Sequence, residues 1–525
     1  MSTETVCLLI PECVLIAAAL AIYVAGAFID APKRWSWIAA GGILLAAGSL
    51  WLQGGMSVVE GPVSSDGLAT FGRWLALAFG GLFVLLSSRP LSGPGTSEYV
   101  GSLLLAIAGL MLVSGASEVV LLFLGLELIS IPTYILLYLG RRDSNSQEAT
   151  LKYFFLSILA SAMLLYGFSF LYGTTGTTDL TAMRAVAGAS AGLADLSKVA
   201  LVLILAGLGF KIAAVPFHFY APDVYQGTTY TNGAILSVLP KAAGFVALAR
   251  IVVAAMPGTE ADGWRVVFVL AVLTMTFGNV VALWQDNLRR LLAYSSIAHA
   301  GYMLIGLAVA LASRATGQPM AFGGLGAMMF YLCVYTVATI GTFAVLDYLG
   351  HRDNPVEGID ELAGLGRTRP VAAAMTAVFM FSLAGIPPLA GFQGKLSIFL
   401  SALSVEGQTA GGNLRPWFIG LAIIGVINAA IAAAYYLRII GTMYFRTPLA
   451  TPRAEGGLGS WCAAVACAVL ALAIGIYPRP LVRASFAAKP AAVYTEGETD
   501  SQKLLSVDRK TWAETASPPP HLPDF

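Results

Sequence analysis

The stretch from residue 118 to residue 138, EVVLLFLGLELISIPTYILLY, indicates the fold class of the chain. It is apolar for about 20 residues, the length that an α-helix needs to cross the hydrocarbon core of a bilayer. The interior charge of this run, Glu127, stands near its middle and not at an end. The stretch therefore predicts a membrane-spanning helix with a carboxylate at its centre.

Runs of this kind recur along almost the whole chain. Of the 525 residues, 57% are hydrophobic and 11% are charged, and the mean hydropathy is +0.77, whereas charged residues approach a quarter of a soluble domain. We expect an all-α polytopic membrane protein with about 14 transmembrane helices. The predicted spans lie near residues 7–29, 36–53, 71–87, 99–115, 118–138, 150–173, 197–219, 230–254, 265–284, 291–312, 325–349, 370–404, 416–444 and 458–480.

Charge and motifs exclude several classes of function. Lys plus Arg (30) balances Asp plus Glu (29), which argues against a nucleic-acid partner. No GxGxxG pattern follows a strand pattern and no GxxxxGK[ST] motif occurs, so nucleotide binding is unsupported. The five cysteines lie in apolar runs without the spacing of a metal site. We expect no cofactor or metal in this chain.

The distribution of cations predicts the orientation. Loops after odd-numbered spans hold about twice as many Lys and Arg residues as the loops on the other face, where Arg73 and Arg250 are counted. Because cations are retained on the cytoplasmic side, both termini are expected on the outer side. Residues 484–525 are polar and end in a proline-rich segment, so we expect a mobile tail there.

Four ionisable residues lie inside apolar runs: Glu127, Lys211, Lys241 and Lys395. Such a side chain costs several kcal/mol unless it is paired or hydrated, so each marks a possible ion or proton path. Snorkelling lysines, or a structural ion pair between Glu127 and Lys211, are the alternatives. The ion pair leaves Lys241 and Lys395 unexplained. Because a nearby carboxylate can switch a buried lysine between holding and releasing a proton, the pattern predicts a proton relay.

Two histidines could extend this relay. His218 follows Lys211 by seven residues, which is two helical turns and would place it on the same helix face. His299 titrates near neutrality and has hydroxyls one turn away, so it could pass protons between Lys241 and Lys395. The alternative for His299 is a hydrogen bond to a neighbouring helix that serves packing.

Proline and glycine predict two broken spans. Pro216 interrupts the seventh span and the segment 385–391, GIPPLAG, interrupts the twelfth; broken spans line ion sites in transporters. Breaks five spans apart are what two inverted five-span repeats would produce. The predicted units are residues 1–98 (spans 1–3), 99–254 (first repeat, spans 4–8), 265–444 (second repeat, spans 9–13), 458–480 (span 14) and 484–525 (the tail).

Four motifs carry a resemblance to a known family. LGLELIS at 124–130, GFKIAAVPFH at 209–218, YSSIAHAGY at 294–302 and AGIPPLAGF at 384–392 resemble the antiporter-like membrane subunits of respiratory complex I, the proton-translocating NADH-quinone oxidoreductase. The resemblance covers roughly residues 5–480 and implies the 14-span fold with inverted repeats. It also implies that Glu127 pairs with Lys211, that Lys241 is the central lysine and that Lys395 is the terminal site.

The resemblance further implies a setting for the chain. It implies a subunit in a bacterial inner membrane that couples electron transfer in other membrane and peripheral subunits to proton pumping. Those partners would hold NAD, FMN, iron–sulfur clusters and quinone. Two other functions stay open: a cation/proton antiporter subunit, and the equivalent subunit of a photosynthetic or hydrogenase-type relative.

Overall fold

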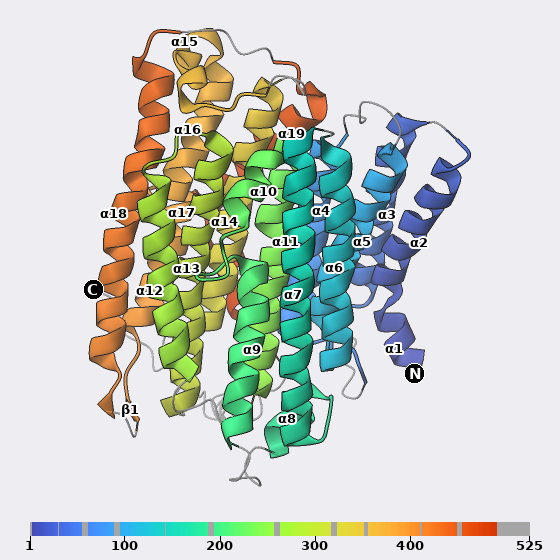
Figure 1. Cartoon of the computed structure of the whole chain (residues 1–525), viewed down its shortest axis with the longest axis vertical. Coiled ribbons are helices and arrows are strands. Elements are labelled where there is room, and N and C mark those ends of the chain that lie inside the picture. The colour runs from blue at the N-terminus through green and yellow to red at the C-terminus, as the bar shows by residue number, and fades with distance from the viewer. Residues whose placement is uncertain are drawn as a thin grey trace, which may run out of the picture.

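Helices run side by side along the long axis of the molecule and form nearly all of its regular structure (Figure 1). The computed structural model describes residues 3–29, 31–54, 61–88, 95–141, 143–186, 194–256, 263–316, 323–350, 355–409, 412–448 and 454–490. Helical geometry suits this sequence because a helix satisfies its own backbone hydrogen bonds where lipid offers none.

Eleven helices among the described residues are long and apolar enough to cross a membrane, which indicates a multi-pass membrane protein. They are α3 (Pro32–Leu52), α4 (Gly67–Leu86), α5 (Thr96–Gly115), α6 (Val119–Gly140), α7 (Ser144–Thr175), α11 (Tyr230–Leu248) with the π-helix η2 (Ala249–Ala255), α12 (Gly263–Ala282), α13 (Leu288–Thr316), α14 (Gly324–Leu349), α18 (Arg415–Phe445) and α19 (Gly457–Ile476).

The remaining elements are shorter. Two are apolar helices of 10–17 residues, α2 (Ile10–Gly26) and α16 (Pro370–Ala384). Two further helices are α9 (Ala194–Ile212) and α17 (Ala390–Leu403). Others are α1 (Thr3–Leu8), α8 (Leu180–Val186), α10 (Ala221–Gly227), the 3₁₀-helix η3 (Ile359–Leu362), α15 (Leu365–Thr368) and α20 (Arg479–Phe486). Strands β1 (Gln408–Thr409) and β2 (Gly412–Asn413) form an antiparallel hairpin that pairs Gln408 with Asn413.

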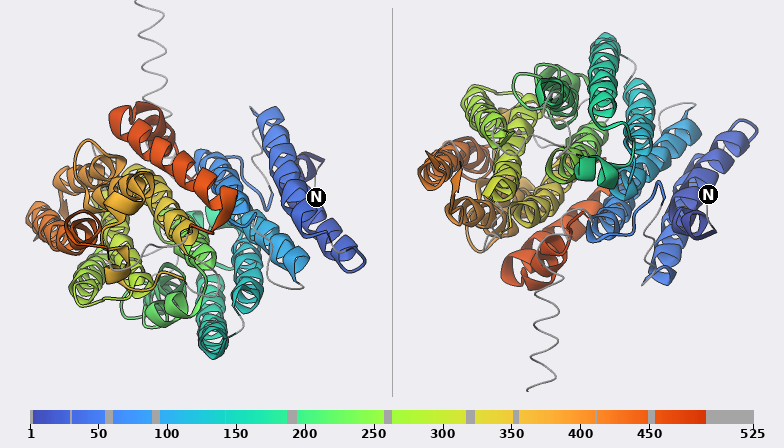
Figure 2. Two further views of the ribbon diagram at one scale, coloured as in Figure 1. Left: turned by 90° about the horizontal axis from the view of Figure 1, so that it is seen from above. Right: turned by 90° about the horizontal axis from the view of Figure 1, so that it is seen from below.

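The core of the bundle is built from α11, α13 and α14, whose most apolar windows are completely buried. Helices that are apolar all round belong in such a position. The N-terminal helices α1–α3 lie at one edge and α18 lies at the opposite edge (Figure 2). Only about a third of the apolar windows of α3 and α18 is buried, which leaves apolar side chains on the outer surface to face lipid or partner proteins.

A helix lies in each stretch that the sequence marks as apolar, but two boundaries differ from expectation. The first concerns the mobile tail that the sequence predicts from residue 484, a prediction that is wrong for residues 484–490. Residues up to Phe486 belong to α20, Phe486 packs against Gly326 of α14, and the backbone oxygen of Lys489 accepts a hydrogen bond from Leu68. Apolar contact and backbone pairing hold this segment to the bundle. Residues 491–525 lie outside the described part of the chain.

The second difference concerns the stretch 197–219, where α9 ends early, at Ile212. Ala213 adopts φ +57°, a left-handed conformation that costs an L-residue roughly 1–2 kcal/mol. Residues 215–220 then form turns that lead into α10. The chain therefore leaves the helical path after Ile212, one residue beyond Lys211.

Candidate functional site

Glu127 and Lys211 lie together between α6, α7 and α9. The Nζ atom of Lys211 lies 3.7 Å from a carboxylate oxygen of Glu127 and donates hydrogen bonds to Ser130 and, at 3.5 Å, to Ser157. Ser161 of α7 donates a 2.5 Å hydrogen bond to Glu127. The Lys211 side chain is 3% exposed and that of Glu127 23%. A partly exposed acid therefore stands beside a buried base.

Lys241 lies in the middle of α11 and is completely enclosed. Its ammonium donates hydrogen bonds to the backbone oxygen and the hydroxyl of Ser296 on α13. Tyr335 of α14 places its hydroxyl 3.5 Å from Nζ and its ring centroid 4.9 Å away. Within the described residues these partners are hydroxyl, carbonyl and aromatic groups, and none is a carboxylate. Lys241 is thus solvated by neutral groups alone.

His299 lies on α13, one turn beyond Ser296, and has a hydroxyl at each ring nitrogen. The hydroxyl of Tyr331 lies 2.6 Å from Nδ1 and that of Tyr436 lies 3.0 Å from Nε2. Tyr436 also shares a 2.5 Å hydrogen bond with Ser295. The His299 ring centroid is 5.0 Å from that of Tyr335, so the histidine adjoins the group that contacts Lys241.

Lys395 lies in the first turns of α17 and points back to the end of α16. Its ammonium donates a 2.8 Å hydrogen bond to the backbone oxygen of Ala384 and stands 5.1 Å from the ring centroid of Tyr302. Gly385 ends α16 with φ +87°, and a Cβ atom there would lie 2.8 Å from Cδ of Lys395. A glycine is required because the chain must turn where the lysine side chain passes.

The argument that put His218 on the same helix face as Lys211 is wrong. Helical spacing does not apply, because α9 ends at Ile212 and His218 lies in the turns beyond it. The half-buried imidazole packs edge-on against Phe277 of α12, with ring centroids 4.6 Å apart. Its Nδ1 atom has no hydrogen-bond partner among the described residues. A role for His218 in the relay stays a prediction.

Hydroxyl groups surround the Glu127–Lys211 pair, Lys241 and His299, and the sequence interpretation missed most of them. These hydroxyl groups are hard to recognise in the sequence, because tyrosine and serine are common in apolar helices. A usable signal was present, since a buried tyrosine hydroxyl normally requires a partner and Ser130 lies one turn after Glu127 on the same helix face. The hydroxyl groups around the site belong to Ser130, Ser157, Ser161, Ser295, Ser296, Tyr331, Tyr335 and Tyr436.

Two further ion pairs are buried beside the N-terminal helices, near the C-terminal end of α11 where it continues into η2. Arg73 of α4 donates a 2.7 Å hydrogen bond to Glu12 of α2, and their side chains are 3% and 1% exposed. Arg250 of η2 donates hydrogen bonds of 2.9 and 3.1 Å to Asp66, which caps α4. The sequence interpretation counted both arginines as loop cations. This is wrong, because each lies within a helix and is paired with a carboxylate.

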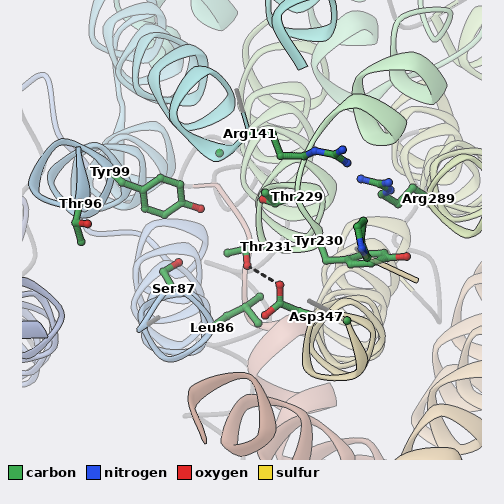
Figure 3. Close-up of a pocket in the computed structure, with 13 residues that line it drawn as sticks. Leu86, Ser87, Thr96, Tyr99, Arg141, Thr229, Tyr230, Thr231, Arg289 and Asp347 are labelled. Atoms are coloured by element: carbon green, nitrogen blue, oxygen red, sulfur yellow. Dashed lines mark hydrogen bonds between the residues drawn. The ribbon is translucent and has the colours of Figure 1, made fainter. Parts of the chain in front are cut away.

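A polar cavity of about 60 Å³ opens at the end of the bundle where α4, α6 and α14 end and α5 and α11 begin. Figure 3 shows Arg141 and Arg289 on one side of it and Asp347 on another, with Tyr99 opposite the arginines. Thr231 donates a 3.4 Å hydrogen bond to Asp347. This cavity lies above the start of α11, the helix that carries Lys241.

Asp223 of α10 joins three helices at the same end. Lys152 of α7 and Arg290 of α13 donate hydrogen bonds to it at 2.9 and 2.8 Å. Burial alone would raise the pKa of the Asp223 carboxyl, but these hydrogen bonds hold the pKa below its ordinary value. Since the pKa is lowered on folding, Asp223 stabilises the folded chain above about pH 4, and this contribution disappears as the pH falls through the lowered pKa.

We therefore expect Asp223→Asn to lower the free energy of unfolding at pH 7 by about 0.5 kcal/mol, as for other partly exposed ion pairs. The difference from the unsubstituted chain should shrink below about pH 4. The measurement is thermal unfolding of the detergent-solubilised variant and of the unsubstituted chain, at pH 7 and below about pH 4. Asp195→Asn is the matched control, because Asp195 pairs with Lys198 on the surface. A destabilisation by Asp223→Asn that persists unchanged below pH 3 would contradict the assignment.

Comparison with known proteins gives consistent matches. The family model for the transmembrane region of NADH:quinone oxidoreductase and Mrp antiporter subunits matches residues 116–412. The chain is 38% identical over 446 residues to NADH-quinone oxidoreductase subunit N of Trichlorobacter lovleyi, covering 83% of this chain and 87% of the relative. It is 37% identical over 445 residues to the subunit of the same name from Rhodospirillum rubrum, with the same two coverages.

Solved structures show the same fold. A chain of respiratory complex I from Thermus thermophilus with bound aureothin matches with a TM-score of 0.76 and 33% identity, covering 92% of this chain and all of that chain. A chain of the Mrp complex from Dietzia sp. DQ12-45-1b matches with a TM-score of 0.75 and 22% identity, over 93% of this chain and 97% of that one. The second likeness is one of fold alone.

Proposed function

The chain belongs to the family of NADH:quinone oxidoreductase and Mrp antiporter membrane subunits, and we propose from this membership and from its buried charges that it is a proton-translocating subunit of an NADH-quinone oxidoreductase. Relatives over most of its length carry the name of subunit N of that enzyme. Electron transfer from NADH to quinone takes place in partner subunits, which hold the flavin and iron–sulfur centres. This chain supplies part of the proton path.

The observation that carries the proposal is the environment of Lys241. Only 2% of this lysine is exposed, and its partners are the neutral groups of Ser296 and Tyr335. A charged ammonium without a carboxylate in such a place is costly. A structural role would favour an apolar residue or a paired lysine. The arrangement suits a group that gains and loses a proton.

The relay begins at Glu127 and ends at Lys395. A charge change in the partner subunits alters the electrostatic potential at the partly exposed Glu127. This change strengthens or weakens the stabilisation that the carboxylate gives to the protonated form of Lys211. Proton occupancy then moves to Lys241, through the hydroxyls of Ser296 and Tyr335 to His299, and on to Lys395. His299 suits the intermediate position because its two nitrogens both face hydroxyls. Release occurs on the outer side.

The finer architecture belongs to the same proposal. We assign fourteen spans, counting α16 and α17 as one broken span and α9 with the turns up to residue 219 as another. Residues 99–254 and 265–444 form two inverted five-span repeats, with 1–98 and 458–480 outside them. The helix ends at Ile212 and Ala384 support this assignment, since backbone freed at membrane depth must be satisfied by protein or water.

The chain is assigned to a bacterial inner membrane with both termini outside. An even number of spans places both ends of the chain on the same side of the membrane. Two contacts support this, because Lys489 pairs with Leu68 at the start of α4 and Glu12 of α2 pairs with Arg73 in the first turns of the same helix. The cation-rich end that carries Arg141, Arg289 and Arg290 then faces the cytoplasm.

The experiment that tests the function is extraction of native membranes in mild detergent. We expect the chain to co-migrate with a multi-subunit assembly that oxidises NADH and contains iron–sulfur clusters, and expect deletion of the chain to remove proton pumping by that assembly. Migration alone, or only with other redox-inactive membrane subunits, would contradict the proposal.

A cation/proton antiporter subunit is the second candidate, and the fold shared with a chain of an Mrp complex favours it. Such a chain would exchange protons for cations without NADH. Sodium-driven proton flux in vesicles that contain this chain without redox partners would support it. Strict dependence of proton flux on NADH and quinone would exclude it.

A further inference from the structure

The face of α14 that packs against α11 carries a regular series of side chains from the end cavity to the relay. Asp347, Phe343, Thr339, Tyr335 and Tyr331 follow one another at intervals of four residues. Successive members of such a row lie next to one another, and the row turns by about 40° at each step. The row therefore follows the interface with α11, where Asp347, Phe343 and Tyr335 contact Thr231, Gly233 and Ser237, and then turns towards α13 at Tyr331. Four of the five side chains are polar, and Phe343 alone is apolar.

The inner end of this face lies within the relay. Tyr335 donates a 2.9 Å hydrogen bond to Ser296, which in turn accepts from Lys241. Tyr331 hydrogen-bonds His299 at 2.6 Å. A proton that reached Tyr335 from the end cavity would therefore arrive at a hydroxyl that is hydrogen-bonded to Ser296, the partner of Lys241.

The outer end of this face lies in the polar cavity. Asp347 accepts hydrogen bonds from Thr231 at 3.4 Å and from Ser460 at 2.6 Å, and Figure 3 shows it at the cavity with Thr231. Two other lining groups, the hydroxyl of Ser87 and Nε of Arg289, are buried and have no hydrogen-bond partner in the described ranges. Buried polar groups normally bind protein or ordered water, so these atoms suit a hydrated cavity.

Phe343 separates the two ends. It is 1% exposed, and its ring centroid lies 6.3 Å from that of Tyr225 and 6.2 Å from that of Tyr230. The ring also lies against Gly233 of α11, where a Cβ atom would come within 2.9 Å of its Cε1 atom. The glycine leaves room for the ring between α11 and α14. The ring thus places one apolar turn between the carboxylate of Asp347 and the hydroxyls of Thr339 and Tyr335.

We propose that this face of α14 is the route by which protons enter from the end cavity to Lys241, with Asp347 as the carboxylate that collects them and Phe343 as the residue that keeps the route closed at rest. The inference rests on the proposed function, because it needs Lys241 to accept a proton. Hydration past the Phe343 ring opens the route, and the dry ring prevents protons from returning to the cavity when the relay is not driven.

The test compares two substitutions of Phe343 in the complete complex, reconstituted into vesicles without NADH. Phe343→Thr replaces the ring with a hydroxyl-bearing side chain that admits water, and we expect the passive decay of an imposed pH gradient to become about tenfold faster, the effect of removing about 1.4 kcal/mol of barrier. Phe343→Leu keeps the step apolar and should leave the decay near the unsubstituted rate.

Phe379→Thr is the matched control. Phe379 is 0% exposed and packs against Gly341 of α14, away from the polar face. Phe379→Thr, like Phe343→Thr, removes a buried phenyl ring beside α14. A leak caused merely by lost packing would therefore appear in both variants. Only Phe343→Thr should accelerate the decay, and adding Lys241→Met should abolish the acceleration if the route leads to Lys241. An acceleration that persists with Lys241→Met would overturn the route.

Asp347→Asn gives a second measurement that does not depend on the fold tolerating Phe343→Thr. We expect NADH-driven pumping to fall severalfold and its pH profile to shift, because the amide cannot collect a proton. Unchanged pumping by Asp347→Asn, or an unchanged leak in an assembled Phe343→Thr complex, would overturn the inference. If Lys241→Met stops pumping while Phe343→Thr does not leak, only the entry route fails; if Lys241→Met pumps normally, the proposed function fails.

Discussion

Replacing Lys241 by methionine should reduce NADH-driven proton pumping at least about tenfold while the complex still assembles. Methionine has a similar length and is apolar, so it fills the enclosed space on α11 without the desolvation cost of the ammonium. Ser296 and Tyr335 keep their mutual 2.9 Å hydrogen bond without the lysine. The measurement is proton uptake into vesicles during NADH oxidation, together with the amount of assembled complex on a native gel.

Lys241→Arg makes the experiment sharper. Arginine keeps the positive charge but does not lose its proton under physiological conditions, so a relay should fail with arginine as it does with methionine. A purely structural cation would be rescued. Lys198→Met is the control, because Lys198 is an exposed lysine paired with Asp195 on the surface, and it should pump normally. Pumping at the unsubstituted rate in Lys241→Met would refute the relay.

The second large effect concerns stability. Arg73→Met should lower the free energy of unfolding by about 3–5 kcal/mol, because removing one partner leaves the Glu12 carboxylate buried without its counter-charge. The pair has the geometry for such an effect, with a 2.7 Å hydrogen bond and almost complete burial of both side chains. The midpoint of thermal unfolding in detergent, and the yield of assembled complex, measure the loss.

The double substitution Glu12→Gln with Arg73→Met should recover most of that loss. Neutral groups of similar size avoid the buried charge, and replacing a whole buried pair is often neutral. Arg438→Met serves as control, since its pair with Asp286 has side chains 40% and 80% exposed and should contribute at most about 1 kcal/mol. If Arg73→Met and Arg438→Met destabilise equally, the Glu12–Arg73 pair does not have the role assigned to it.

The charged centres of the site could be predicted from the sequence because each is conspicuous in its own surroundings. Glu127, Lys211, Lys241 and Lys395 interrupt apolar runs, and the cost of burying a charge depends on that local context. Arg73 and Arg250 escaped recognition because a charge near the end of an apolar run also fits an ordinary anchor at the membrane surface. Only the folded structure shows that both are buried beside carboxylates.

The sequence interpretation missed the buried ion pairs because their partners are distant in the chain and meet only in the folded structure. Glu12 and Arg73 are 61 positions apart, and Asp66 and Arg250 are 184 apart, so no local pattern joins them. The helix-face argument for His218 was wrong for a different reason. The argument for it assumed that a helix continued beyond Lys211, but α9 ends at Ile212 and the turns that follow direct the imidazole towards Phe277.

From the amino-acid sequence alone, this chain could be recognised as a helical membrane protein with four ionisable residues inside apolar runs, because bilayer thickness and the cost of desolvation act on each run separately. Its four motifs also pointed to the family. The packing of the helices was needed to show which hydroxyls solvate Lys241, which acids pair with the buried arginines, and that the ring of Phe343 lies between Asp347 and Tyr335 along α14. These contacts depend on how α11, α13 and α14 pack against one another, and packing between distant segments leaves no periodic signal in the chain.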